Sequence, residues 1–187
     1  GTFEDQQDTF TDLGILMVLI IILVFSVMAA QFESLVDPFV IMFSIPFAFT
    51  GIVLGLAVTQ TPLGVMALIG VIMLMGIVVK NGIVLIDYTI LCRERGMGII
   101  TSVVTAGKSR LRPVLMTTLT TVLGMIPMAV GTGEGSEMWR SMGMTVAWGL
   151  SVSTLITLII VPTVYAVFAA NGVKRRRRKI RKALRNN

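Results

Sequence analysis

Long runs of apolar residues, separated by short polar segments, dominate the chain. Five of these runs should cross a membrane as helices, at about residues 13–31, 38–58, 63–91, 113–130 and 142–168. Each is near the roughly 20 residues that a helix needs to cross a bilayer. The runs do not alternate apolar and polar residues as the strands of a membrane β-barrel do. The pattern therefore predicts an all-α membrane protein built as a five-helix transmembrane bundle.

The second and third runs carry features that should shape their helices. Pro38 stands where the second run begins, in a first-turn position that needs no amide donor. Pro46 lies inside the same run and should kink it, which membrane helices tolerate. The third run is longer than a bilayer requires, so its helix should tilt or protrude from the membrane.

The connector between the third and fourth runs, residues 92–112, mixes basic and apolar positions. Its apolar residues recur at helical spacing with polar residues between them: Ile99, Ile100, Val103, Val104 and Leu111. Such a pattern is typical of an amphipathic helix on a membrane surface. We therefore expect a short cytoplasmic surface helix, with Pro113 opening the fourth span.

Lysine and arginine are divided unevenly between the two sides of the predicted membrane. One side holds the connector (Arg93, Arg95, Lys108, Arg110, Arg112) and the tail (Lys174 to Lys179 without a break, then Arg181, Lys182 and Arg185). The other side holds Arg140. The positive-inside rule then places the connector and tail in the cytoplasm and the amino terminus outside.

This orientation divides the chain into three parts. Residues 1–12 form a periplasmic stub, residues 13–170 the transmembrane domain, and residues 171–187 a basic cytoplasmic tail. The acidic opening has neither an initiator methionine nor a signal-peptide pattern. We expect such an opening in an internal segment of a longer protein.

Composition supports a membrane protein and narrows its chemistry. Hydrophobic residues make up 55% of the chain and charged residues 14%, against about a quarter charged in soluble domains. The net charge of +6 does not indicate nucleic-acid binding, because the basic residues lie at helix ends and in the tail. With no histidine and a single cysteine, Cys92, the sequence predicts no metal site and no other cofactor. Catalytic motifs of enzymes are also missing, so we expect a transporter rather than an enzyme.

Small residues at a spacing of four mark candidate contacts between helices. Gly51 and Gly55 form one such pair, and Gly143, Ala147 and Ser151 form a longer series. These patterns let membrane helices approach closely. The alternative is that glycine is simply frequent in membrane helices.

Lys80 is the most informative position, because it interrupts an apolar span. A cation near the centre of a membrane helix costs about 2.5–3.5 kcal/mol on insertion scales, so it usually faces a protein interior or a water-filled path. The alternative, snorkelling to the surface, requires the helix to protrude. Asp87 lies two turns away, about 10 Å along the axis, too far for a direct ion pair. Either Lys80 pairs with a carboxylate outside this chain, or burial deprotonates it.

A stripe of hydroxyls follows in the fourth span. Thr117, Thr120 and Thr121 share one helix face with Gly124. They can relay protons or hydrogen-bond a lysine, or they can bond their own backbone and only pack. Arg110, just before this span, is either a topology anchor or the cytoplasmic mouth of a proton path.

Three segments resemble one transporter superfamily. Residues 76–88 (GIVVKNGIVLIDY) resemble the tenth transmembrane helix of resistance-nodulation-division multidrug pumps. Residues 110–118 (RLRPVLMTT) resemble the start of the eleventh helix of those pumps, and residues 30–39 the loop between the eighth and ninth. The resemblance covers nearly the whole chain, from helix eight to the tail.

The resemblance implies a proton relay. In this superfamily a lysine on helix ten pairs with two aspartates on helix four, and their protonation moves the helices and drives drug export. Lys80 matches that lysine, Asn81 follows it as in the family, Thr117 matches a relay threonine, and Arg110 an arginine at the cytoplasmic approach. Thr121 and Asp87 are possible supporting residues. The energy source would be the proton gradient, without a cofactor.

The resemblance also implies partners. They are the remainder of the transporter with its aspartate pair, a homotrimer, a periplasmic adaptor and an outer-membrane channel, in the inner membrane of a Gram-negative bacterium. Retention of Lys80 favours the multidrug branch over the heavy-metal branch. Alternatives are a protein-export, lipid or metal transporter of the same superfamily, or a stand-alone membrane scaffold. Without the aspartates, this chain should not transport alone.

Overall fold

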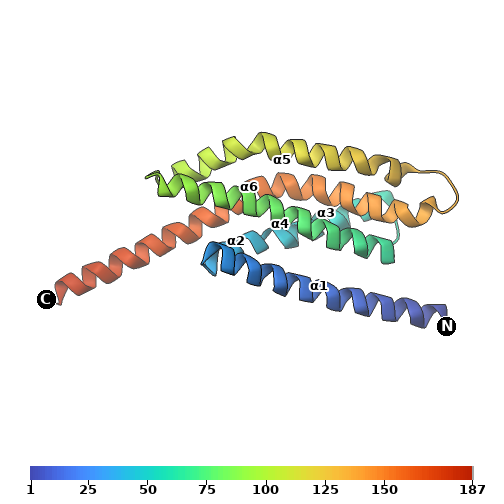
Figure 1. Cartoon of the computed structure of the whole chain (residues 1–187), viewed down its shortest axis with the longest axis horizontal. Coiled ribbons are helices and arrows are strands. Elements are labelled where there is room, and N and C mark those ends of the chain that lie inside the picture. The colour runs from blue at the N-terminus through green and yellow to red at the C-terminus, as the bar shows by residue number, and fades with distance from the viewer. Residues whose placement is uncertain (187) are drawn as a thin grey trace.

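Helices account for nearly all of residues 1–186, the part of the chain that the computed structural model describes (Figure 1). They are α1 (Thr2–Phe32), α2 (Val36–Met42), α3 (Ser44–Thr59), α4 (Val65–Glu94), α5 (Ile99–Val130) and α6 (Ser136–Arg185). Five segments are long and apolar enough to cross a membrane, with α2 and α3 together forming one of them. The predicted all-α bundle of five spans is confirmed.

The second span is broken where the sequence predicted a kink. Its two helices, α2 and α3, meet at Phe43, three residues before Pro46. Proline has no amide hydrogen and its ring clashes with the carbonyl four residues earlier, here that of Met42. At the break, the Ser44 hydroxyl donates a hydrogen bond to the Ile41 carbonyl at 2.6 Å. The break is therefore a local consequence of Pro46.

The predicted separate surface helix is wrong, because residues 99–130 form one continuous helix, α5. Ser102 and Ala106 are completely buried, and Val103 packs against the main hydrophobic core. Of the apolar positions of the connector, Val103 therefore packs on the bundle, whereas Ile100, Val104 and Leu111 stay 76%, 48% and 44% exposed. Pro113 lies inside α5 without ending it, since proline removes one backbone hydrogen bond and neighbouring groups in a bundle can compensate.

Two helices extend beyond the spans predicted from the sequence. The α1 helix already begins at Thr2, so most of the stub at residues 1–12 is helical. The α6 helix has 50 residues and continues through the basic tail to Arg185. In Figure 1 this tail projects away from the bundle as the red end of the ribbon.

The α6 helix is central and packs against α3, α4 and α5. Small residues allow these close approaches. A Cβ atom on Gly51 would lie 2.8 Å from Cβ of Val152, and one on Gly143 would lie 2.9 Å from the Ala129 nitrogen. Gly55 fits against Trp148 in the same way. The predicted helix contacts at these three glycines are confirmed.

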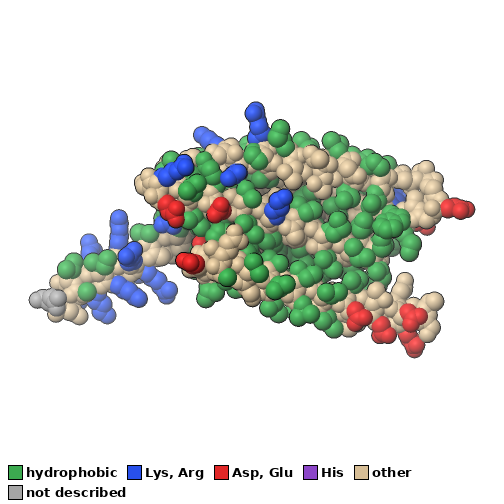
Figure 2. Space-filling model, viewed as in Figure 1, with side chains coloured by type: hydrophobic (Ala, Val, Ile, Leu, Met, Phe, Trp, Pro, Cys, Tyr) green, Lys and Arg blue, Asp and Glu red, His purple; other side chains and the backbone are tan. Residues whose placement is uncertain are grey.

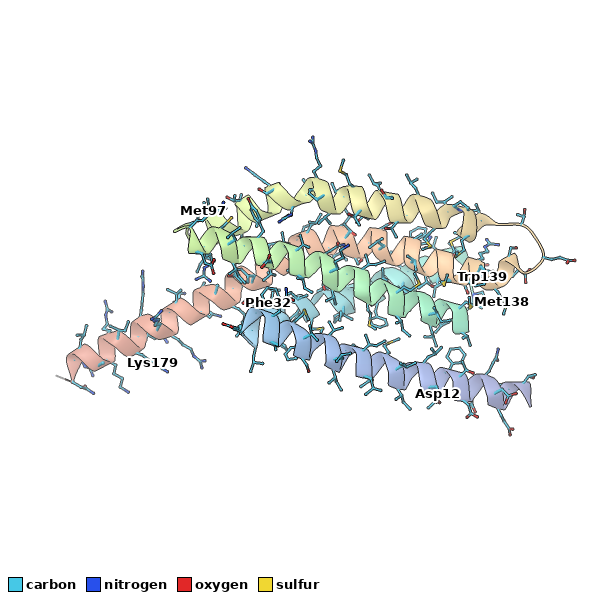
Figure 3. The ribbon with its side chains drawn as sticks, viewed as in Figure 1. Asp12, Phe32, Met97, Met138, Trp139 and Lys179 are labelled. Carbon is cyan, nitrogen blue, oxygen red and sulfur yellow. The ribbon has the colours of Figure 1, made fainter. Side chains whose placement is uncertain are left out.

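The two ends of the bundle differ in charge. Asp12 and Trp139 mark one end in Figure 3, and Phe32 and Met97 mark the other. Lysine and arginine side chains crowd the projecting tail in Figure 2, and acidic side chains gather around the amino terminus at the opposite end. This arrangement supports successive spans that run in opposite directions through the bundle. Which end faces the cytoplasm stays a prediction.

Candidate functional site

Lys80 lies on an exposed face of α4. Its side chain lines a cavity of about 310 Å³ between α1, the α2–α3 span and α4. All other lining residues are apolar or glycine: Ile20, Ile21, Val24, Met42, Ile45, Ile72, Met75, Gly76, Val79, Ile83 and Val84. The one salt bridge among residues 1–186 joins the amino terminus to Glu4. Lys80 therefore has no ionic partner in the described chain, and the absence of an ion pair with Asp87 confirms the estimate from helix spacing.

Lys80 is exposed, so the protein interior that a lysine in a membrane span usually faces is not supplied by these five helices. The same α4 face carries the exposed residues Met73, Gly76 and Asp87, at intervals of three, four and seven residues. The opposite face is covered by the bundle, with Leu74, Val78 and Leu85 at 1% exposure or less among its residues. These five helices cover one side of α4 and leave the Lys80 side open.

Asn81 belongs to the covered side, although it directly follows Lys80. Its side chain is 8% exposed, and the next residue, Gly82, lies against Ile41 of α2. Successive residues of an α-helix point about 100° apart, so the two neighbours enter different surroundings. The structure does not bring Asn81 and Lys80 to a common contact.

The threonine hydroxyls of α5 bond to their own helix. The Thr117 hydroxyl donates to the Pro113 carbonyl at 3.0 Å, and that of Thr121 donates to the Thr117 carbonyl at 2.9 Å. The Thr120 hydroxyl makes the same kind of bond to the Met116 carbonyl at 2.8 Å. Of the two possibilities for this stripe, the structure has the one in which each threonine bonds to its own backbone. A role in a proton relay would require these hydroxyls to rotate.

Arg110 is held by an aromatic ring that the sequence interpretation did not single out. Its guanidinium carbon lies 4.9 Å from the centroid of the Tyr88 ring, a cation–π contact between α5 and α4. The Arg110 Nε is buried and has no hydrogen-bond partner within residues 1–186. Tyr88 follows Asp87 in the motif around Lys80. Its contact with Arg110 becomes visible only when α4 and α5 are packed together.

The Arg110–Tyr88 contact also relates the depths of Lys80 and Thr117. The helices α4 and α5 are antiparallel neighbours joined by a short turn (Figure 1). Lys80 precedes Tyr88 by eight residues and Thr117 follows Arg110 by seven. At about 1.5 Å per residue, both lie roughly 10–12 Å beyond the contact, on the same side of it. They therefore share a depth in the bundle.

Two hydroxyls of α6, those of Thr154 and Thr157, are also buried inside the bundle. The Thr118 and Thr154 hydroxyls lie 3.1 Å apart and form a buried hydrogen bond between α5 and α6. Thr157 is 3% exposed, and its hydroxyl has no partner among the described residues. We call this contact between α5 and α6 the seam. The sequence could have indicated it only through threonines placed within apolar spans. Residues 1–186 hold no cluster of three or more Cys, Asp or Glu residues that could bind a metal ion.

Comparisons with known proteins place the chain among efflux transporters. The family model of the AcrB/AcrD/AcrF family matches residues 1–169. The swarming motility protein SwrC of Bacillus subtilis is 42% identical over 170 residues, which are 90% of this chain and 16% of that protein. The cobalt-zinc-cadmium resistance protein CzcA of Cupriavidus metallidurans is 38% identical over 88% of this chain and 16% of its own length.

Multidrug and metal transporters both appear among the similar proteins. The multidrug resistance protein MdtC of Proteus mirabilis is 34% identical over 94% of this chain and 17% of its own length. The crystal structure of a heavy metal efflux pump superimposes with a TM-score of 0.82 at 30% identity, covering 91% of this chain and 17% of the pump. The chain thus spans about a sixth of these relatives, and the multidrug branch stays a prediction.

Proposed function

Because the chain belongs to the AcrB/AcrD/AcrF family of resistance-nodulation-division transporters, we propose that its five helices supply the lysine half of a proton-driven efflux transporter. The whole transporter would export hydrophobic or amphiphilic compounds across the bacterial inner membrane. The observation that best supports this role is Lys80, a cation without an ionic partner on the open face of α4.

Lys80 would pair with carboxylates from the remainder of the transporter, the aspartate pair that the family resemblance implies. An adjacent cation favours the charged form of a carboxylate and lowers its pKa. Protonation of the aspartates would weaken the pair and let the open face of α4 shift. A proton gradient across the membrane, without a further cofactor, would then drive the cycle.

The other candidate residues take supporting roles in this proposal. Thr117 shares the depth of Lys80 and would carry a proton after its hydroxyl leaves the Pro113 carbonyl. Arg110, fixed over Tyr88, would stand at the cytoplasmic approach. Thr121 and Asp87 would support the path from α5 and from the exposed face of α4.

The proposal includes an orientation, with the amino terminus periplasmic and the carboxyl terminus cytoplasmic. Cysteines introduced by Gly133→Cys and Gly172→Cys should then label from opposite sides of the membrane. Labelling of both from one side would contradict it. In the complete transporter we expect a homotrimer that works with a periplasmic adaptor and an outer-membrane channel.

A second candidate function is the export of metal cations. It is favoured by the 38% identity to the cobalt-zinc-cadmium resistance protein and by the likeness to the heavy metal efflux pump. Resistance assays with the parent transporter, in cells lacking their own pumps, would separate the two functions. Protection against dyes and detergents supports drug export, and protection against zinc or cobalt salts alone supports cation export.

The relay is tested by removing the cation in the parent transporter. Lys80→Ala should abolish resistance at unchanged expression, because the carboxylates lose the cation that keeps their pKa low. Lys108→Ala removes an exposed cation from the amino-terminal part of α5 and serves as the matched control, with resistance retained. Full resistance in the Lys80→Ala strain would refute the relay.

A further inference from the structure

A second cavity, of about 570 Å³, opens where the tail of α6 leaves the bundle. It lies between the end of α1, the start of α2, the last turns of α4 and the middle of α6. Phe32, labelled in Figure 3 at the end of α1, belongs to its wall. This cavity is separate from the one that Lys80 lines.

Charged side chains of both signs line this second cavity. Arg93 and Arg176 contribute cations from α4 and α6, and Asp37 and Glu94 contribute carboxylates from α2 and α4. None of the four belongs to a salt bridge within residues 1–186, where the one such bridge is at the amino terminus. Two cations and two carboxylates therefore face one space without being paired to each other.

One of the cations is fixed in position. The Nη1 of Arg93 donates a hydrogen bond to the Tyr165 hydroxyl at 3.1 Å, linking α4 to α6. Tyr165 is 4% exposed and belongs to the main core, so it is a rigid acceptor. An arginine guanidinium has five N–H donors, and this bond uses one of them. The remaining donors are available to a ligand in the cavity.

The rest of the wall is apolar. Phe32, Ile90, Phe168 and Val173 line the cavity. Phe168 is held edge-on by Phe39, with ring centroids 6.1 Å apart. A site with an apolar wall and unpaired charges at one end of a membrane bundle matches a molecule that has a charged head and a hydrocarbon chain.

We propose that this cavity binds a phospholipid whose headgroup carries both a phosphate and a primary ammonium, as in phosphatidylethanolamine. Arg93 and Arg176 bind the phosphate, because arginine forms paired hydrogen bonds with phosphate oxygens. Asp37 and Glu94 accept hydrogen bonds from the ammonium, and an acyl chain lies along Phe168. The two carboxylates select this zwitterionic head over an anionic one, which they repel.

The inference concerns a binding site and does not depend on transport. With the proposed orientation, the lipid comes from the cytoplasmic leaflet, near the nine lysine and arginine residues of the tail. Those cations attract anionic lipids to the surrounding surface, whereas the cavity adds an ammonium site that the tail lacks. The test therefore compares headgroups within one membrane.

The first experiment is native mass spectrometry of the 187-residue chain, released from micelles with equal amounts of phosphatidylethanolamine, phosphatidylcholine and phosphatidylglycerol. Phosphatidylethanolamine should be retained preferentially, because the quaternary ammonium of phosphatidylcholine has no N–H donor. Arg93→Gln with Arg176→Gln should lower lipid retention about tenfold. Asp37→Asn with Glu94→Gln should remove the preference for phosphatidylethanolamine and increase retention of phosphatidylglycerol.

Controls separate this site from general charge and from misfolding. Arg178→Gln with Arg181→Gln removes the same charge from the tail outside the cavity and should leave the preference unchanged. Arg93→Lys with Arg176→Lys keeps the charge but loses the paired hydrogen bonds, so its retention should lie between those of the unchanged chain and the glutamine variant. Equal retention of the three lipids, an equal loss in the tail variant, or a lysine variant that retains no more lipid than the glutamine variant would overturn the proposal. So would loss of the preference in the full-length parent, because another segment would then occupy the cavity.

Discussion

Polar side chains are paired in the seam between α5 and α6 but unpaired on the open face of α4. In the seam, the Thr118 and Thr154 hydroxyls bond to each other at 3.1 Å, and Gly143 brings the two backbones together. On the open face, Lys80 and Asp87 are exposed, with no salt bridge in the described chain. The Thr118 and Thr154 hydroxyls thus find partners within these five helices, whereas in our proposal the open face is completed by the remainder of the transporter.

This difference separates two kinds of substitution. Changes in the seam should alter the stability of the bundle, whether or not the rest of the transporter is present. Changes on the open face should leave the five helices intact and affect only the transport activity of the parent protein. The comparison fails if seam variants are stable or if open-face variants unfold.

The largest effect on stability is expected from closing the space at Gly143. In Gly143→Val, the new Cβ would lie 2.9 Å from the Ala129 backbone nitrogen, so the two helices must separate. Such overpacking costs about 1–3 kcal/mol, and the melting temperature in detergent should fall. Gly124→Val is the control, since nothing lies within 4 Å of a Cβ there. An equal loss in both variants would show that β-branching, not the seam, is responsible.

Tyr88 should have the next largest effect. Tyr88→Leu removes the ring beneath Arg110 and about 0.5–2 kcal/mol of cation–π energy, so transport by the parent should weaken several-fold. Tyr88→Phe keeps the ring and should retain near-normal transport and its pH profile. If both variants behave alike, the contact at 4.9 Å does not position Arg110.

A smaller effect is expected from the buried hydroxyl pair. In a double-mutant cycle with Thr118→Val and Thr154→Val, the coupling free energy of unfolding should be about 0.6 kcal/mol, the average for bonds between membrane helices. Thr117→Val is a suitable reference, because its hydroxyl bonds only to its own helix. Coupling near zero would mean that the 3.1 Å bond does not join α5 to α6.

The smallest effect on transport is expected at Thr117 itself. In the parent, Thr117→Ala should reduce efflux less than Lys80→Ala does, because water can replace one hydroxyl in a proton path. Efflux rates at several pH values would measure the difference. Complete loss in Thr117→Ala, with normal expression, would give this threonine a role that water cannot fill.

The sequence predicted what depends on local pattern. The five spans follow from the length of the apolar runs, and the break before Pro46 follows from a missing amide hydrogen. The contacts at Gly51 and Gly143 follow from small residues spaced for helix packing. These features need no knowledge of which helices are neighbours.

The features that the sequence did not predict depend on which helices are neighbours in the bundle. An apolar residue of the connector can face lipid or protein, and here Val103 packs on the bundle while Ile100 and Val104 are exposed. Tyr88 was not recognised because its contact with Arg110 joins residues that are distant in the chain. The exposure of Lys80 depends on which helices surround α4, and one helix alone does not specify them.

Efflux from liposomes tests most directly whether the open face of α4 needs a partner. The 187-residue chain, the parent transporter and its Lys80→Ala variant are reconstituted separately, and dye transport is followed with and without a proton gradient. We predict gradient-dependent transport by the parent alone, because coupling requires a proton site that differs between two conformations. Gradient-dependent transport by the isolated chain, or by the Lys80→Ala variant, would contradict the proposal.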